Sequence, residues 1–201
     1  MVAYPLSRKE FFAKNFLMFM LMFTMYFQGG LIPTYLLVKQ IGLLNKWPVM
    51  ILLSAVNVFN VIIAKTNIES NIPEELYEAS SIDGCSHIRF FTSIVIPLSK
   101  TIISVLVLYY GIAHWNEFMT PLIYLRNNKL YPLQLVLRSI LVQNQMQAQM
   151  VGDIDSILEK QKAGELIKYG VIIVASLPVL IIYPFLQKYF VKGVMVGSVK
   201  G

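Results

Sequence analysis

Residues Glu78–Pro97, EASSIDGCSHIRFFTSIVIP, form a polar stretch between two runs that are apolar enough to cross a lipid bilayer. A short helix is expected to begin just before this stretch. Pro73 suits a first helical position, and Glu74 and Glu75 would complement the positive end of the helix dipole. Gly84 can adopt the left-handed backbone that ends a helix, and the chain after it can resume as a second helix. The sequence thus predicts a helical hairpin between membrane spans.

The composition of the 201-residue chain is that of a membrane protein. Hydrophobic residues make up 56% and charged residues 14%, with a mean hydropathy of +0.62, whereas a soluble domain carries about 25% charged residues. The single cysteine, Cys85, excludes an internal disulfide and a multi-cysteine metal site. The net charge of +6 comes from basic residues that mostly flank apolar runs. This pattern fits lipid headgroups and membrane topology better than nucleic acid.

Runs of uncharged residues predict an all-α, polytopic bundle, because a span needs about 20 apolar residues. We expect one domain over residues 1–201, with a kink or unwound turn where Gly29, Gly30 and Pro33 end the first span. Lys and Arg are divided almost equally between the two sides of such a bundle, so charge alone does not orient it. The four predicted spans are residues 14–37, 47–65, 98–124 and 168–188.

The hairpin resembles the EAA motif of ABC importer permeases. The order Glu-Ala-small, three residues, Gly, nine residues, Ile, one residue, apolar, Pro is met at every spacing. Ser80 replaces the usual second Ala and Ile96 the usual Leu, and both changes keep size and polarity close. The residues to which the resemblance assigns ATPase coupling are Glu78, Ala79, Ser80, Gly84, Ile94 and Pro97.

Flanking segments extend the resemblance over nearly the whole chain. HWNEF at 114–118, YLRNNKLYPLQLVLR at 124–138 and the ending YPFLQKYFVKGVMVGSVKG at 183–201 are similar to MalG-like carbohydrate permeases, in particular the LplC type, which is associated with uptake of complex-polysaccharide fragments. Such permeases usually have six spans. The resemblance therefore implies that two spans precede Met1 and that this chain is truncated at its N-terminus.

The resemblance implies a type I ABC importer transmembrane domain with a cytoplasmic coupling segment at residues 70–97, which docks on an ABC ATPase subunit. It also implies a second permease subunit, an extracytoplasmic solute-binding protein, and a multi-pass position in the bacterial cell membrane with both termini cytoplasmic. ATP would be bound by the ATPase subunits, so no cofactor is expected in this chain.

The sequence lacks the common motifs of enzyme active sites. The sequence contains no GxxxxGK[ST] phosphate-binding loop, no GxSxG nucleophile motif and no HExxH. His87 and His114 lie far apart in the sequence and do not suggest a zinc site. No catalytic residue and no metal site are expected.

Substrate contact is expected near the outer end of the third span, in HWNEF. An ionisable residue in or near a span suggests a functional role. An aromatic ring can stack on a sugar ring, and an amide and a carboxylate can form hydrogen bonds with its hydroxyls. An interfacial Trp with a snorkelling acid is the alternative. Two Asn residues three apart in the second span share a face, which fits helix–helix hydrogen bonding or substrate contact. The candidate pathway residues are His114, Trp115, Asn116, Glu117, Asn57 and Asn60.

The sequence also fits other functions. The EAA motif also fits a permease for an amino acid, a phosphonate or a metal, and a four-span chain also fits a non-transporting scaffold or a truncated membrane protein. Arg126, Lys129 and Arg138 either favour acidic sugars or form a solvated external surface.

Overall fold

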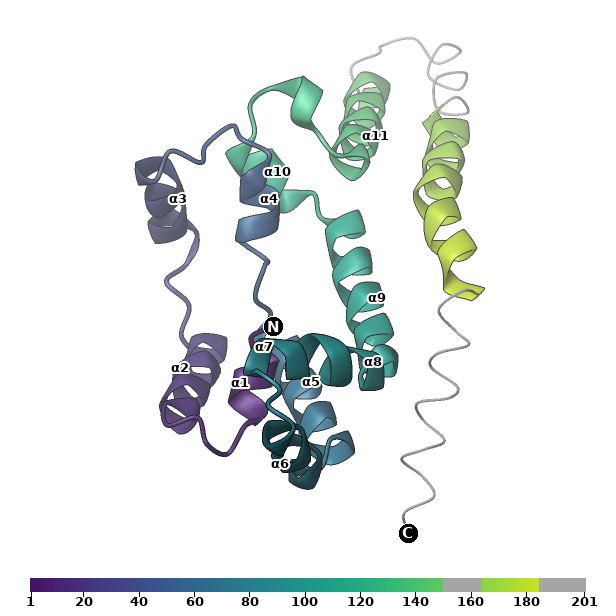
Figure 1. Ribbon diagram of the computed structural model, residues 1–201. Coiled ribbons are helices and arrows are strands. Elements are labelled where there is room, and N and C mark those ends of the chain that lie inside the picture. Colours follow the sequence, from purple (N-terminus) through teal and green to yellow (C-terminus); the bar gives the residue numbers. More distant parts are fainter. Residues whose placement is uncertain (150–163, 185–201) are drawn as a thin grey trace. The chain divides into compact units, whose positions relative to one another are not determined.

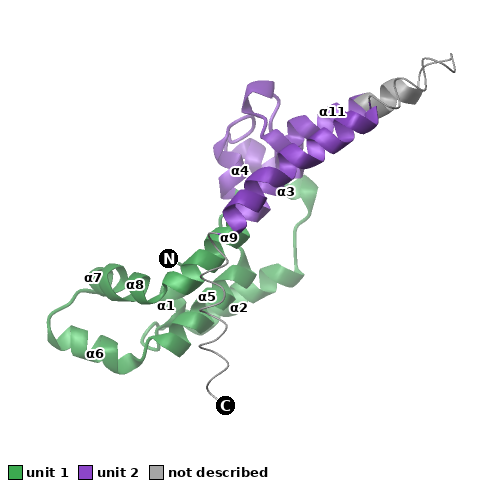
Figure 2. Cartoon of the chain, turned by 90° about the vertical axis from the view of Figure 1, so that its right-hand side faces the viewer, with its two compact units in different colours: residues 1–34, 53–110, 186–201 green, residues 35–52, 111–185 purple. Residues whose placement is uncertain are grey.

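The computed structural model describes residues 1–149 and 164–184, and every regular element in these ranges is a helix (Figure 1). The described chain divides into two compact units (Figure 2). Unit 1 comprises Met1–Thr34 and Leu53–Tyr110, and unit 2 comprises Tyr35–Leu52 with residues 111–149 and 164–184. Each unit buries apolar residues of its own.

Unit 1 is built around α1 (Ala3–Ser7), which packs on α5 (Val58–Asn71) and contacts α2 (Lys14–Tyr26). Small side chains at this contact let the two backbones approach closely. By contrast, α2 is almost entirely apolar and buries none of its residues within the chain, as expected of a helix surrounded by lipid. The buried residues of this part of unit 1 are Ala3, Leu6, Val61, Ala64 and Ile102.

The helical hairpin predicted from the sequence is present in unit 1. Its first arm is α6 (Glu74–Ile82), and its second arm runs through α7 (His87–Phe90), the π-helical turn η1 (Phe91–Val95) and α8 (Ile96–Leu98). The chain then enters α9 (Lys100–Asn116), which passes from unit 1 into unit 2 after Tyr110. The hairpin has a small core of its own, formed by Ile72, Tyr77, Phe90 and Val95.

Unit 2 takes in most of α3 (Leu31–Gln40), together with α4 (Pro48–Leu52), α10 (Met119–Tyr124), α11 (Leu133–Gln149) and the helix Gly164–Pro184. A short 3-10 turn, η2 (Asn128–Leu130), lies between α10 and α11. The residues buried together in this unit are Val38, Val49, Met50, Tyr124 and Leu125.

Asn45 joins two loops of unit 2. Its φ of 58° lies in the left-handed region, which Asn tolerates better than most residues. Its backbone N–H donates to the Tyr124 carbonyl at 2.8 Å, and its side-chain Oδ1 accepts from the backbone N–H of Arg126 at 3.0 Å and of Asn127 at 2.9 Å. The loop after α10 is thereby fixed to the loop before α4.

The helices can be compared with the predicted spans. Among the described residues, Gly164–Pro184 alone is long and apolar enough to cross a membrane, and two broken pairs, α2 with α3 and His87–Leu98 with α9, also qualify if each pair counts as one span. The first pair is interrupted at the expected glycines, where Gly30 has a φ of 83°. Over residues 47–65 the structure has α4, a break, and the start of α5. The last four residues of the predicted span 168–188 lie outside the described residues.

Candidate functional site

The first arm of the hairpin is a capped helix that ends in a glycine turn. Glu74 and Glu75 lie in the first turn of α6, where the helix dipole favours acids. Pro73 precedes the helix in an extended conformation rather than occupying its first turn. At the other end Gly84 has a φ of 74°. Its N–H donates to Ser81 O at 3.0 Å and that of Cys85 to Ser80 O at 2.9 Å, the pair of bonds that defines a Schellman motif.

The six coupling residues divide by exposure. Glu78, Ala79, Gly84 and Pro97 are exposed, whereas Ile94 is half-buried. Ser80 is buried, and its hydroxyl donates to the Tyr77 carbonyl at 2.8 Å. The free face of α6 also carries Ile82, whose side chain is 87% exposed. An apolar side chain beside an acid and a small residue can bind a groove of another protein.

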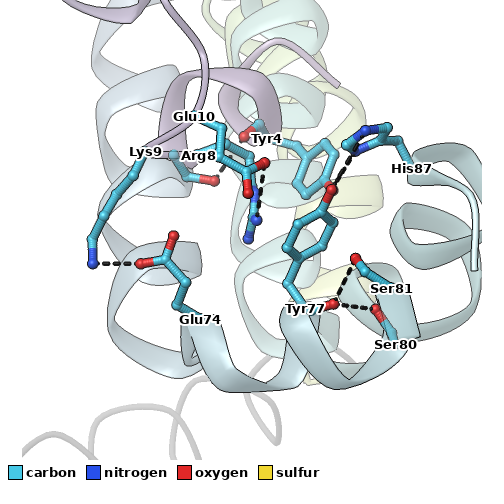
Figure 3. A network of polar contacts seen from close by, with 10 residues as sticks. Tyr4, Arg8, Lys9, Glu10, Glu74, Tyr77, Ser80, Ser81 and His87 are labelled. Carbon is cyan, nitrogen blue, oxygen red and sulfur yellow. Dashed lines mark hydrogen bonds and ion pairs between the residues drawn. The ribbon is translucent and has the colours of Figure 1, made fainter. Parts of the chain in front are cut away.

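A polar network that sequence reasoning missed lies behind α6 (Figure 3). The Arg8 guanidinium lies over the Tyr77 ring, with its central carbon 3.6 Å from the ring centroid. The Tyr77 hydroxyl is 3.0 Å from Nδ1 of His87, and Lys9 forms an ion pair with Glu74. One signal in the sequence could have indicated this contact. Residues 8–9 are both basic and residues 74–75 are both acidic, so the two pairs can attract each other.

Four ionisable groups around the hairpin have shifted pKa values. The hydrogen bond between Lys9 and Glu74 raises the pKa of the ammonium and lowers the pKa of the carboxyl. Burial opposes ionisation of Glu69. Hydrogen bonds from Lys65 at 2.7 Å and Lys14 at 3.0 Å nevertheless hold its pKa below the ordinary value. Burial raises the pKa of the Tyr4 phenol. These contacts favour the charged forms of Lys9, Glu74 and Glu69.

The two asparagines of the predicted second span have different roles. Asn57 is the N-cap of α5, and its Oδ1 accepts from the Asn60 backbone N–H at 3.1 Å. The Asn57 backbone N–H donates to the Tyr110 hydroxyl at 3.1 Å. Asn60 is buried, with 7% of its surface exposed, and lines a cavity of about 280 Å³. The cavity is also lined by Met1, Val2, Ala3, Ala55, Val56, Val61, Ala64, Leu106 and Tyr110.

The HWNEF residues lie in unit 2, at the end of α9. The Trp115 indole N–H donates to the Ala175 carbonyl at 2.9 Å and so ties α9 to the helix Gly164–Pro184. Glu117 accepts from the Thr120 backbone N–H at 2.9 Å and caps the start of α10. Asn116 is exposed and His114 is half-buried. The asparagines of α5 belong to unit 1, so the candidate pathway residues form two groups in different units.

Metal-ligating side chains do not gather anywhere in residues 1–149 and 164–184: no group of three His, Cys, Asp or Glu there could hold an ion. The Arg138 guanidinium, one of the predicted basic candidates, lies 4.1 Å from the centroid of the Phe118 ring. Arg126 and Lys129 are exposed. The chemistry that the hairpin and its network offer is therefore docking and charge pairing.

Two proteins of Bacillus subtilis (strain 168) resemble the chain over its whole length. The polygalacturonan/rhamnogalacturonan transport system permease protein YtcP is 44% identical over 202 residues, and Protein LplC is 42% identical over 200 residues. The alignments cover 100% of this chain but 69% and 66% of those proteins. The chain thus spans about two thirds of the length of these relatives.

A solved structure and a family profile agree with these relatives. The chain matches the structure of a bacterial ABC transporter involved in the import of the acidic polysaccharide alginate, with a TM-score of 0.80 and 28% identity. The match covers 94% of this chain and 66% of that chain. The expected fold, a type I ABC importer transmembrane domain, is confirmed by this match. The profile of the binding-protein-dependent transport system inner membrane component matches residues 4–196. The chain belongs to this family of transporter membrane subunits and is not an enzyme.

Proposed function

We propose that the chain is the permease subunit of an ATP-driven, binding-protein-dependent importer of oligosaccharides released from acidic polysaccharides. YtcP is named for polygalacturonan and rhamnogalacturonan, and the solved transporter imports alginate. Uronic acids occur in all three polymers, and oligosaccharides cut from them carry carboxylates. Exposed Arg126 and Lys129 in unit 2 support an anionic substrate, since Arg and Lys bind carboxylates by charge and hydrogen bonding.

The observation that carries the coupling role is the hairpin itself. Tyr77 and Ser80 are buried on one face of its first arm, where Arg8 stacks on the Tyr77 ring, while Glu78, Ala79 and Ile82 stay exposed on the other face. A short helix fixed on one side and free on the other suits docking in a groove of an ATPase subunit. Movement of that subunit would then reach the membrane helices through the hairpin as a rigid-body displacement.

The partners follow from this role. Two ATPase subunits would bind ATP, a second permease subunit would complete the pathway, and an extracytoplasmic binding protein would deliver the sugar. The hairpin and both termini of the chain would face the cytoplasm. We assign Asn60, at the cavity of unit 1, and His114, Trp115 and Asn116 of unit 2 to the sugar pathway. Asn57 and Glu117 cap helices beside them.

The alternatives gain no support from the relatives named above. The names of YtcP and the alginate importer suggest neither a permease for an amino acid, a phosphonate or a metal nor a non-transporting membrane protein.

Uptake of radiolabelled digalacturonate tests the substrate class. A strain that lacks the gene should lose this uptake and regain it from a plasmid copy, whereas uptake of neutral maltotriose should not change. An importer of neutral sugars would reverse the two results, and unchanged uptake of both would contradict the proposed function.

A further inference from the structure

The segment before α2 lies against the hairpin, and we call residues Ala3–Lys14 the N-terminal brace. Ala3 and Leu6, 6% and 2% exposed, fix its helix α1 on α5. Its last residue, Lys14, begins α2 and binds Glu69 near the end of α5 at 3.0 Å. The brace is therefore attached to two of the helices of unit 1.

The central contact between brace and hairpin is made by Arg8. Its guanidinium stacks on the Tyr77 ring at 3.6 Å, and 14% of its side chain is exposed. Its Nε and Nη2 atoms are buried and have no hydrogen-bond partner in the described chain, and the Glu10 carboxylate is 3.6 Å from Nη2. The Tyr77 ring face and the Glu10 carboxylate are thus the two neighbours that offset the desolvation of this charge.

Two further contacts flank Arg8. Lys9 pairs with Glu74 in the first turn of α6, and the Tyr4 ring lies 5.0 Å from the ring of Phe91 in the second arm. The brace therefore contacts both arms of the hairpin.

The two arms are also joined to each other through Tyr77. Its hydroxyl is 3.0 Å from His87 Nδ1, the two rings stack with centroids 5.6 Å apart, and the Phe90 ring packs edge-on against it at 5.2 Å. Tyr77 is 9% exposed. Figure 3 shows Tyr77 between Arg8 and His87. A displacement of Tyr77 would therefore disturb its contacts with both.

We infer that Arg8 is a positioning residue for energy coupling: it holds the docking hairpin against the N-terminal brace, so that displacement of the hairpin is passed to α2 through Lys14 and to α5 through α1. This inference rests on the proposed function for its consequence in transport, but the brace itself is a property of this chain. It adds a further connection to the membrane helices beside the two covalent ones, which run from α5 into α6 and from α8 into α9.

The first test measures amide hydrogen exchange of residues 74–90 in the full-length permease, purified in detergent. Arg8→Gln removes the charge and the stacked plane, and exchange in this range should accelerate about tenfold, the order of a desolvated cation–π contact in an equilibrium constant. Arg8→Lys keeps the charge without the planar group, so its exchange rate should fall between those of the wild type and Arg8→Gln. Lys100→Gln, which removes an exposed cation of unit 1 outside the network, should leave exchange unchanged.

The second test measures coupling in the assembled importer, reconstituted with its ATPase, partner permease and binding protein. The ratio of ATP hydrolysed to digalacturonate taken up should rise several-fold in Arg8→Gln, partly recover in Arg8→Lys, and stay at the wild-type value in Lys100→Gln.

A further variant, Tyr77→Phe, belongs to the exchange measurement. It keeps the ring beneath Arg8 but loses the hydroxyl, and should accelerate amide exchange in the second arm only.

The outcomes separate the two hypotheses. Unchanged exchange in Arg8→Gln would overturn the brace. Faster exchange with an unchanged coupling ratio would overturn its role in transport. If the wild-type assembly takes up no digalacturonate, the proposed substrate is wrong, while the exchange data still decide whether Arg8 holds the hairpin.

Discussion

Gly84 is required for its backbone conformation rather than for its size. A Cβ placed there would meet no heavy atom within 4 Å, yet the φ of 74° is one that side-chain-bearing residues rarely adopt. The bulk of a substituent therefore matters less than its ability to occupy the left-handed region, which Asn enters more readily than β-branched residues.

Gly84→Val should destabilise the turn by about 1–2 kcal/mol or more, because the left-handed conformation costs that much for an ordinary residue. We expect less ABC ATPase to co-purify with the full-length permease and oligosaccharide uptake to fall in proportion. Gly84→Asn should retain most of both. Equal recovery of the ATPase with Val and Asn would show that the turn does not position the docking helix.

Some residues of the site could be predicted from the sequence, and others could not. The Gly84 turn and the acids that begin α6 follow from local rules on helix ends, which act over a few residues. Arg8 and Tyr77 are far apart in the sequence, and no local rule brings an Arg onto a Tyr ring. The left-handed conformation of Asn45 escaped prediction for the same reason, since the loop that it binds lies beyond α10.

At the scale of elements, α5 shows how a polar residue in an apolar run can be misjudged. A continuous helix over residues 47–65 would place Asn57 and Asn60 on one face. In the structure the helix begins at Val58, and Asn57 satisfies the N–H of Asn60 instead of reaching a neighbour. The polar side chain marks a helix start, as Asn does in soluble proteins.

Asn57→Ala should lower the stability of the permease by about 1 kcal/mol through loss of the cap, seen as a lower midpoint of thermal unfolding in detergent. Asn57→Asp preserves the cap and should restore the midpoint. If capping is the whole role of Asn57, the Asp variant also keeps the wild-type KM for uptake. A stable Asp variant with a changed KM would instead place Asn57 in contact with the sugar.

At the scale of the whole molecule, the helical class and the family could be inferred from apolar runs and one spaced motif, and the comparisons confirm both. The division into two units could not, because it depends on which helices share a core. The chain leaves unit 1 within α3, after Thr34, and returns to it after Leu52, and such crossings leave little trace in hydropathy.

The proposed orientation can be tested with the native thiol. Cys85, the single cysteine of the chain, lies in the hairpin, and a small membrane-impermeant thiol reagent should modify it only after cells are opened. With Cys85→Ser as background, a cysteine introduced by Asn128→Cys in the exposed loop of unit 2 should react in intact cells. Modification of Cys85 in intact cells would place the hairpin outside and reverse the topology.

The unburied surface of α2 has a consequence for how this chain can evolve. Because lipid scarcely distinguishes Leu from Met or Phe, single positions of α2 are free to drift among apolar residues as long as the overall composition holds. The positions of α5 that pack on α1 lack that freedom. Lys14 pairs with Glu69 and Leu21 packs against the core around α1 and α5. Any other position of α2 that resists drift across related genomes would therefore mark where a neighbouring subunit, rather than lipid, covers the helix.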